Sequence, residues 1–220
     1  MAQNRPNHGG FNQNMPKITC KTCRRLGFSV CGKEKCAFKR KPYSPGIHGR
    51  KKGGFKRRSN QSEYGNQLKE KQKVKFLYGL REKQFRNLVA KAIAAKSAET
   101  SRRIVELLET RLDNVVYRLG FASSRKAARQ MVNHGHIMVN GKKTNIPSRA
   151  LKIGQQVSVR PQSLGLGIFR DLDLRLKKHQ VPSWLNLKQD QREGHIVAFP
   201  SAEEVDTGAN LNSIIEFYSR

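Results

Sequence analysis

Residues 107–143 read LLETRLDNVVYRLGFASSRKAARQMVNHGHIMVNGKK, and this stretch decides the fold. Apolar residues recur at helical spacing through its first part and beyond, so we expect one amphipathic helix that begins at a cap on Ser101 and ends at Gly120. A second helix follows, capped by Ser123 or Ser124 and ended by Gly135. The two apolar faces comprise Ile104, Val105, Leu108, Leu112, Val115, Val116 and Leu119, then Ala127, Ala128, Met131 and Val132.

The second of these helices carries three cations. At 100° per residue, Arg125, Lys126 and Arg129 fall opposite the apolar positions, so we expect all three to face outward together. The pair Asn140-Gly141 lies between alternating residues and predicts a tight hairpin turn, with Lys142 and Lys143 at its tip. Together with a short strand at 156–160, these elements predict a compact unit of two helices and a small antiparallel sheet.

A helical region precedes this unit. The pattern becomes helical from Ser62, and the clearest stripe consists of Phe85, Leu88, Val89, Ala92 and Ile93. The spacing i, i+3, i+4, i+7, i+8 is typical of an amphipathic helix that buries one face.

The chain has 44 Lys and Arg against 16 Asp and Glu, a formal charge of +28 over 220 residues. Such an excess favours a polyanionic partner, because bound phosphates relieve the repulsion and release counterions. A membrane is a weaker candidate, since no apolar run reaches the roughly 20 residues of a spanning helix and the first residues do not resemble a signal peptide. We expect a soluble intracellular protein.

The most basic segment is 39–58, KRKPYSPGIHGRKKGGFKRR, and no acid occurs between Glu34 and Glu63. Its composition predicts an arm that lies along phosphates and is disordered until it binds, with Tyr43 available for stacking on a base. A solvated linker is the alternative. The polar residues 1–19 predict a disordered extension.

All four cysteines lie in TCKTCRRLGFSVCGKEKC, residues 19–36. The spacing C-x2-C-x7-C-x4-C suits four thiolates around a tetrahedral zinc ion. A disulfide is disfavoured in a reducing compartment, and a redox C-x-x-C is expected near a β-α-β pattern that this segment lacks. Four free buried thiols remain the alternative.

The stretch at 107–143 resembles the RNA-binding module of the ribosomal small-subunit protein S-four family, in its bacterial form. Other segments agree in the right order: KRKPYSPGIHG at 39–49, SEYGNQLKEKQKVKFLYGLREKQFRNL at 62–88 and IIEFYSR at 214–220. The resemblance spans about residues 17 to 220, and zinc-carrying members of the family have four cysteines at the N-terminal position.

The resemblance implies an α+β architecture. Residues 1–19 form a disordered polar extension and 20–48 a zinc-binding basic segment. Residues 49–99 and 207–220 form a helical domain. Residues 100–206 form an inserted domain that contains the RNA-binding module at about 109–170.

The resemblance also implies a function: a structural constituent of the small ribosomal subunit that binds ribosomal RNA directly and nucleates assembly. Its implied partners are small-subunit ribosomal RNA, neighbouring proteins, especially S-five, with which it supports translational accuracy, and messenger RNA near the entry side. It implies a place on the cytoplasmic ribosome, an organellar ribosome being less favoured, and no membrane or small-molecule substrate. The rivals are a free-standing RNA-binding regulator or quality-control factor, and an RNA-modifying enzyme that uses the module as a tether.

Candidate site residues follow from charge pattern and resemblance together. One structural zinc ion per chain is expected on Cys20, Cys23, Cys31 and Cys36. The candidate RNA contacts are Arg24, Arg25, Lys39, Arg40, Lys41, Tyr43, His48, Arg50, Lys51, Lys52, Arg57, Arg58, Lys71, Lys73, Arg111, Arg118, Ser124, Arg125, Lys126, Arg129, His134, His136, Lys142 and Lys143.

We expect no catalytic residues. The pair His134 and His136 has no nearby carboxylate or cysteine in sequence to orient it, so we assign it to a helix end and an RNA contact. Arg111-Leu112-Asp113 is similar to a catalytic loop of pseudouridine synthases, but the residues that follow do not continue that motif. Asp113 is therefore expected to form a structural ion pair or cap.

Overall fold

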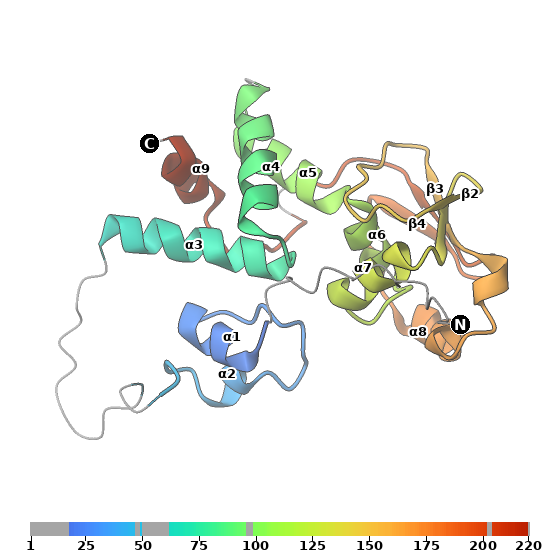
Figure 1. Cartoon of the computed structure of the whole chain (residues 1–220), viewed down its shortest axis with the longest axis horizontal. Coiled ribbons are helices and arrows are strands. Elements are labelled where there is room, and N and C mark those ends of the chain that lie inside the picture. The colour runs from blue at the N-terminus through green and yellow to red at the C-terminus, as the bar shows by residue number, and fades with distance from the viewer. Residues whose placement is uncertain (1–17, 47–48, 50–61, 96–98, 202–203, 220) are drawn as a thin grey trace, which may run out of the picture.

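The computed structural model describes residues 18–46, 49, 62–95, 99–201 and 204–219 (Figure 1). The expectations for the N-terminal extension and for most of the basic arm, including His48, Arg50, Lys51, Lys52, Arg57 and Arg58, concern residues outside these ranges. The helices are α1 (Cys20–Leu26), α2 (Ala37–Arg40), α3 (Glu63–Leu77), α4 (Glu82–Ala94), α5 (Thr100–Glu109), α6 (Leu112–Arg118), α7 (Arg125–Asn133), α8 (Leu172–Lys178) and α9 (Leu211–Ser219). The strands are β1 (Ile137–Val139), β2 (Lys142–Thr144), β3 (Gln156–Val159), β4 (Leu185–Lys188) and β5 (Glu193–Ile196).

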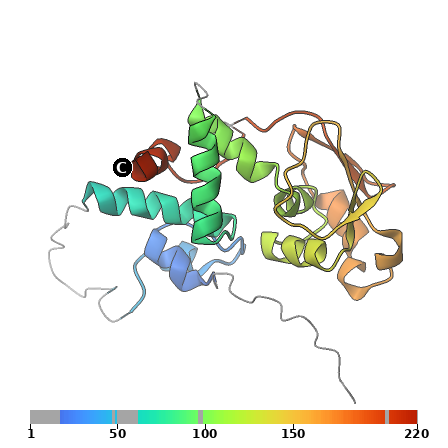
Figure 2. The same ribbon diagram turned by 45° about the horizontal axis from the view of Figure 1, so that its top comes forward.

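Helices α3, α4, α5 and α9 form a helical group in which the last helix of the chain packs beside α3, far from it in sequence (Figure 2). Its core contains Val74, Phe85, Val89, Ile104 and Ile214 among others. The stripe predicted for α4 is confirmed, because Phe85, Val89 and Ala92 are buried. Within the described residues, every helix is too short or too polar to cross a membrane.

The prediction of a single helix from Ser101 to Leu119 is wrong. The chain breaks between α5 and α6, where the backbone at Leu112 and Asp113 donates to Arg149 O and Pro147 O at 2.9 and 3.1 Å. The apolar spacing runs unbroken across this point because two helices in succession bury their faces, α5 in the helical group and α6 in the next core. Ser101 lies inside α5 rather than capping it, and Gly120 ends α6 with φ at 81°, as expected.

The packing of α5 also bears on the domain boundary. Ile104 and Leu108 belong to the helical core, so α5 joins the helical group one helix beyond the boundary at residue 99 that the sequence suggested.

Helices α6, α7 and α8 pack against an antiparallel sheet of strand order β2-β1-β3-β5-β4. We call these three helices and five strands together the module; it extends beyond the RNA-binding module expected at about 109–170. The predicted hairpin is present: Val139 pairs with Lys142, and Asn140 and Gly141 have φ of 50° and 74°, as a two-residue turn of this kind requires. Strand β3 ends one residue before the predicted limit. Strands β4 and β5 and helix α8 were not predicted.

The N-terminal segment folds as a small unit beneath α3, which we call the knuckle (Figure 1). It consists of α1, α2 and their loops around a third apolar cluster that contains Cys23, Leu26, Val30 and Cys36. Phe76 of α3 packs against this cluster, so the knuckle is attached to the helical group through an apolar contact. Helix α2 includes Lys39 and Arg40, so the first two residues of the basic arm are helical rather than disordered as predicted.

Candidate nucleic-acid interface and cysteine cluster

Helix α7 presents its cations in two directions. Ser124 caps the helix by accepting a hydrogen bond from Ala127 N at 3.2 Å, as predicted. Lys126 is exposed, but only 18% of the Arg125 side chain and 13% of the Arg129 side chain are exposed. The prediction that all three cations face outward is wrong, because two of them reach buried acids and backbone carbonyls of neighbouring elements.

Glu109 is the centre of the first buried ionic group. Its carboxylate has no exposed surface and accepts hydrogen bonds from Arg118 Nε and Nη2, both at 2.9 Å. The Tyr78 hydroxyl donates to Glu109 Oε1 at 2.5 Å, and Asn114 Nδ2 donates to Oε2 at 2.8 Å. Burial raises the pKa of the Glu109 carboxyl, but the arginine charges and hydrogen bonds outweigh it and hold that pKa below its usual range.

Asp113 is the centre of the second group and confirms the expected structural ion pair. Arg111 donates to both carboxylate oxygens at 3.1 and 3.0 Å, and Arg129 approaches Oδ2 to 2.6 Å. Four arginines thus surround two buried carboxylates. The arginines predicted to contact RNA at 111, 118, 125 and 129 are held in internal ion pairs, and because two carboxylates are shared among four cations the group keeps a net positive charge.

Two lysines of α3 from the candidate set are also engaged internally. Lys71 is 9% exposed at its side chain, pairs with Glu82 at 2.8 Å and lies over the ring of Phe217 at 4.5 Å. Lys73 pairs with Glu70 at 2.6 Å. These contacts attach the C-terminal helix and neighbouring side chains to α3.

The hairpin and the end of α7 form the exposed basic part of the module. Lys142 and Lys143 are exposed at the hairpin tip, as predicted, and His134 is exposed beside them in the fold. The Lys143 side chain crosses Gly135, where a Cβ would lie 2.3 Å from Lys143 Cε. This brings the lysine to the C-terminal end of α7, a position that favours a cation.

His136 is partly buried beneath this surface. Its Nδ1 lies 3.0 Å from Ser163 Oγ, and its ring meets Phe169 edge-on at 6.0 Å. Burial lowers the pKa of His136, and the nearby charges of His134, Arg160 and Lys143 lower it further. These contacts pack His136 beneath the basic surface, and among the residues that the structure describes its hydrogen-bond partner is a serine hydroxyl rather than a carboxylate.

The knuckle brings the cysteines together. The sulfur atoms of Cys20, Cys31 and Cys36 lie within 4.8 Å of one another, and Cys23 is buried in the same apolar cluster. Sulfur atoms around a tetrahedral zinc ion lie about 3.8 Å apart, given Zn–S bonds of about 2.3 Å. All four thiols are free of disulfides, and the three sulfur atoms of Cys20, Cys31 and Cys36 are placed so that they could hold a metal ion; Cys23 lies outside that group of three.

Two of the thiols differ in acidity. Burial raises the pKa of Cys23 to about 12. Burial also raises the pKa of Cys36, but hydrogen bonds from Ser29, the backbone of Phe38 and the thiols of Cys31 and Cys23 lower it to about 7. Cys36 therefore becomes a thiolate more readily than Cys23, and the thiolate is the form that binds metal.

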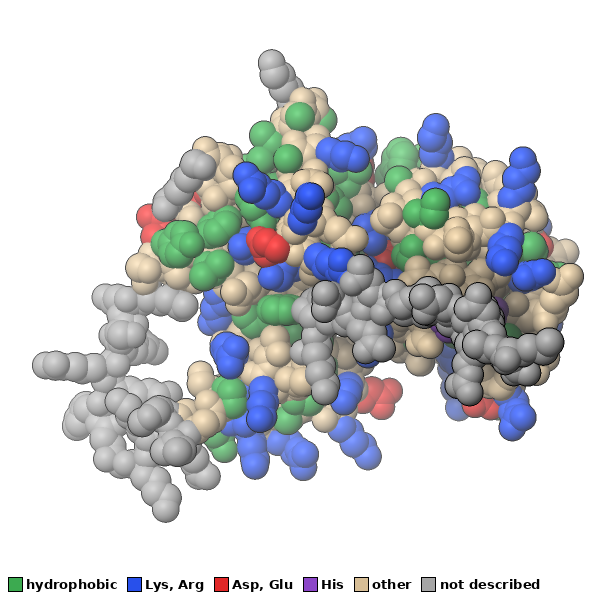
Figure 3. Space-filling view, in the orientation of Figure 1, with side chains coloured by type: hydrophobic (Ala, Val, Ile, Leu, Met, Phe, Trp, Pro, Cys, Tyr) green, Lys and Arg blue, Asp and Glu red, His purple; other side chains and the backbone are tan. Residues whose placement is uncertain are grey.

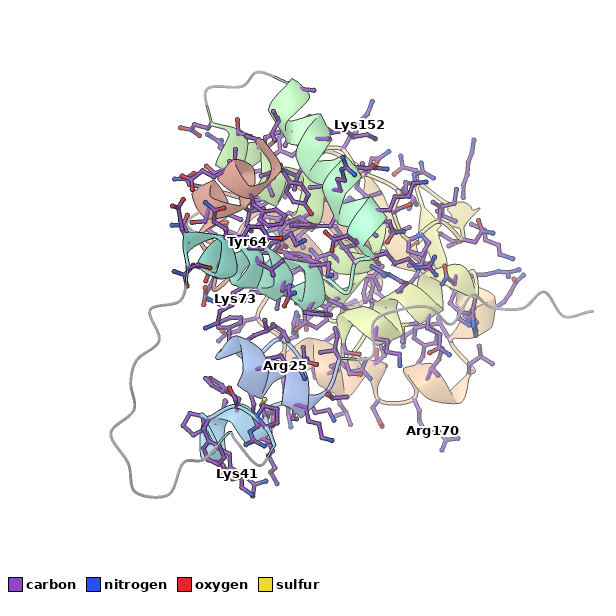
Figure 4. All side chains as sticks on the ribbon, turned by 60° about the vertical axis from the view of Figure 1, so that its left-hand side comes forward. Arg25, Lys41, Tyr64, Lys73, Lys152 and Arg170 are labelled. Carbon is purple, nitrogen blue, oxygen red and sulfur yellow. The ribbon has the colours of Figure 1, made fainter. Side chains whose placement is uncertain are left out.

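Exposed cations surround the cysteine cluster. Arg25, Lys39, Arg40 and Lys41 are exposed, and Figure 4 shows Arg25 and Lys41 on the knuckle, away from α3. Arg24 instead lies over the ring of Tyr43 at 4.6 Å and donates to Tyr43 O at 2.9 Å. This contact covers one face of the ring that was expected to stack on a base.

Lys and Arg side chains gather on the knuckle and over the module in Figure 3, with few acids between them. Some exposed cations were absent from the predicted set, including Lys152 in the loop before β3 and Arg170 before α8 (Figure 4). The sequence signal for these was weak, since each is an isolated base in a loop. The exposed cations thus come both from the knuckle and from the module.

Comparison with known proteins places this geometry in a family. Residues 15–109 match the ribosomal protein S4/S9 N-terminal domain, and residues 110–157 match the S4 domain. The chain belongs to the ribosomal protein S4 family. The boundary between the two S4-family matches falls at the break between α5 and α6, where the chain passes from the helical core to the module core.

Curated relatives in the S4 family resemble the chain along most of its length. Small ribosomal subunit protein uS4 of Chloroflexus aurantiacus is 48% identical over 202 residues, which cover 91% of this chain and 96% of that protein. The proteins of the same name from Syntrophomonas wolfei and Thermotoga petrophila are each 45% identical, over 207 and 208 residues, with the same coverage. Such coverage does not favour the rival of an RNA-modifying enzyme, which would carry a further catalytic domain.

Proposed function

We propose that this chain is the uS4 component of a small ribosomal subunit and that it binds ribosomal RNA directly, as a structural protein rather than an enzyme. The observation that carries the proposal is the match to uS4 proteins over 91% of the chain. The exposed cations of the module and the knuckle support it, because phosphate contacts supply most of the affinity of a protein for a nucleic acid backbone. The finer roles proposed are nucleation of assembly, contact with the S5 protein and with messenger RNA near the entry side, and support of decoding accuracy on the cytoplasmic ribosome.

We narrow the proposed RNA contacts of the module to the exposed candidates. Lys126, Lys142, Lys143 and His134 are exposed on α7 and the hairpin. Their exposed side chains can reach phosphates at the surface of the protein. The remaining basic candidates of the module, Arg111, Arg118, Arg125 and Arg129, are assigned to its internal ion pairs.

Binding to small-subunit ribosomal RNA at several salt concentrations tests the proposal. K126Q should weaken binding and reduce the slope of log K against log salt by up to about 0.9, the value for one phosphate contact with a duplex. K73Q is the matched control, because Lys73 is paired with Glu70 and should leave the slope unchanged. Equal affinity for ribosomal and unrelated RNA in wild-type protein, or equal slopes for both variants and wild type, would contradict the assignment.

We further propose that the knuckle binds one structural zinc ion through Cys20, Cys23, Cys31 and Cys36. The close approach of three of the sulfur atoms, those of Cys20, Cys31 and Cys36, supports this. Four protein ligands would leave no open position for catalysis. C31S should lose stoichiometric metal and loosen the knuckle, while the fluorescence of Trp184, buried in the module core, stays unchanged. Metal-free wild-type protein with an equally ordered knuckle would refute the site.

A further inference from the structure

The contacts of Arg129 join two separate cores. Arg129 belongs to α7 of the module, but its Nη1 donates to Gly79 O at 2.8 Å and its Nη2 to Tyr78 O at 3.3 Å. Those carbonyls follow the last turn of α3, where the helix dipole favours a cation. At the other edge of the guanidinium, Asp113 of the module accepts from Nε at 2.8 Å. One side chain thus bridges the helical group and the module.

Arg125 makes a second bridge one helical turn earlier. Its guanidinium lies between the rings of Tyr78 and Tyr117, at 4.8 and 4.7 Å from their centroids. Its Nε donates to Asn114 Oδ1 at 2.8 Å, and its Nη2 lies 3.9 Å from Glu109 Oε1. The residues that it contacts come from α5, from α6 and from the position directly after α3, so it too spans both cores.

The two arginines are held by internal contacts. They share two buried carboxylates with two further arginines, so the group as a whole keeps a net positive charge. Only 18% of the Arg125 side chain and 13% of the Arg129 side chain are exposed, so each offers less to a phosphate than an exposed lysine such as Lys126. We therefore expect their main contribution to RNA binding to come through geometry.

We call the contact of Arg125 and Arg129 with the end of α3 the junction. Its geometry matters because exposed cations lie on both sides of it. The knuckle is attached to α3 on one side, and the hairpin with Lys142 and Lys143 is on the other. When two binding surfaces are held at a fixed angle, the second contact forms as an intramolecular step, and the entropy of ordering is not lost on binding. A loose junction would forfeit that gain without removing any phosphate contact.

We propose that Arg125 and Arg129 are positioning residues that fix the module relative to the helical group, so that the knuckle and the hairpin meet one folded RNA at once. This inference rests on the RNA-binding function proposed above. It assigns a role to two arginines of α7 that differs from phosphate contact.

The substitutions R129Q and R129K separate the two roles. R129Q removes charge and bridge, whereas R129K keeps the charge but loses the planar fork that reaches Asp113 and two carbonyls together. Both should reduce affinity for small-subunit ribosomal RNA on the order of tenfold, with a salt slope equal to that of wild type. R192Q is the matched control, because Arg192 is also ion-paired, with Asp173 at 2.9 Å, but lies within the module. It should leave affinity unchanged.

Motion in the RNA-free protein gives an independent readout. Backbone nitrogen relaxation should show the helical group and the module tumbling as one body in wild type and R192Q, and with separate correlation times in R129Q. Trp184 fluorescence checks that the module of each variant is folded. Should R129Q not fold, R129K carries both measurements.

Three results would overturn the proposal: joint tumbling in the folded R129 variants, a slope reduced as far as in K126Q, or wild-type affinity in R129K with loss in R129Q. The last two would identify Arg129 as a phosphate contact. The tumbling measurement does not involve RNA, so it tests the positioning role of Arg129 independently of the proposed RNA-binding function.

Discussion

The hydroxyl of Tyr78 offers a direct measure of the buried network at the junction. Tyr78 is 3% exposed, and its hydroxyl donates to the fully buried Glu109 carboxylate. Burial and the neighbouring carboxylate raise the pKa of this phenol, so it stays protonated and a donor. The change Y78F removes this one donor and keeps the ring beside Arg125.

A hydrogen bond to a charged group contributes about 1.5–3 kcal/mol. The lower end applies here, because Glu109 Oε1 also accepts from Arg118 Nη2 at 2.9 Å and is not left without a donor. Y78F should therefore reduce the free energy of unfolding by about 1.5 kcal/mol. For a chain of this length, that corresponds to a fall of about 3–6 °C in the melting temperature.

Urea denaturation followed by two probes tests this value. The chain has one tryptophan, and Trp184 lies in the module core, so its fluorescence reports the module while far-ultraviolet circular dichroism reports all helices. The matched control is Y117F, whose ring also contacts Arg125 but whose hydroxyl has no hydrogen-bond partner given among the described residues. Its effect should stay within about 0.5 kcal/mol. Equal stability of Y78F and wild type, or an equal loss in Y117F, would refute the reasoning.

Two further changes test the ionic contacts and the core. Burial raises the pKa of Glu82, but hydrogen bonds from two lysine ammonium groups and a tyrosine hydroxyl lower it more, from 4.5 to about 2. Because the pKa of Glu82 is lower in the folded protein, its carboxylate stabilises the fold above pH 4.5, and this contribution is lost as pH falls toward 2. The difference in urea midpoint between wild type and E82Q should therefore shrink over that pH range. A difference that stays constant would argue against a stabilising role of the Glu82 carboxylate. In G194A, the new Cβ would lie 2.4 Å from Leu119 Cδ2 inside the module core, so tryptophan fluorescence should report a loss of about 1–3 kcal/mol. G165A, whose Cβ would meet no atom within 4 Å, should change stability by less than about 0.5 kcal/mol. Similar losses in G194A and G165A would show that Leu119 moves to make room for the new Cβ at little cost.

Local sequence signals were sufficient to predict several helices and strands. The spacing of Phe85, Val89 and Ala92 predicted α4, and Asn140-Gly141 predicted the hairpin, because helix periodicity and turn chemistry depend on residues a few positions apart. The cysteine spacing likewise predicted a cluster, and the structure brings three of its four sulfur atoms within 4.8 Å of one another. The short strands β4 and β5 were missed, since β5 pairs with β3 across more than 30 residues of sequence and β4 joins the sheet only through β5.

The sequence by itself determined that the chain is strongly basic, that it carries an S4-type helix and hairpin, and that its four cysteines are grouped. Only the tertiary structure decided where the helix of the apolar stripe breaks and which cations remain outside. Periodicity gives the angle of a residue around its own helix, but it does not show what packs on the other side. Arg125 and Arg129 lie opposite the apolar face of α7, yet Tyr78, Gly79 and the buried acids meet them there, because the helical group closes over that side of the helix.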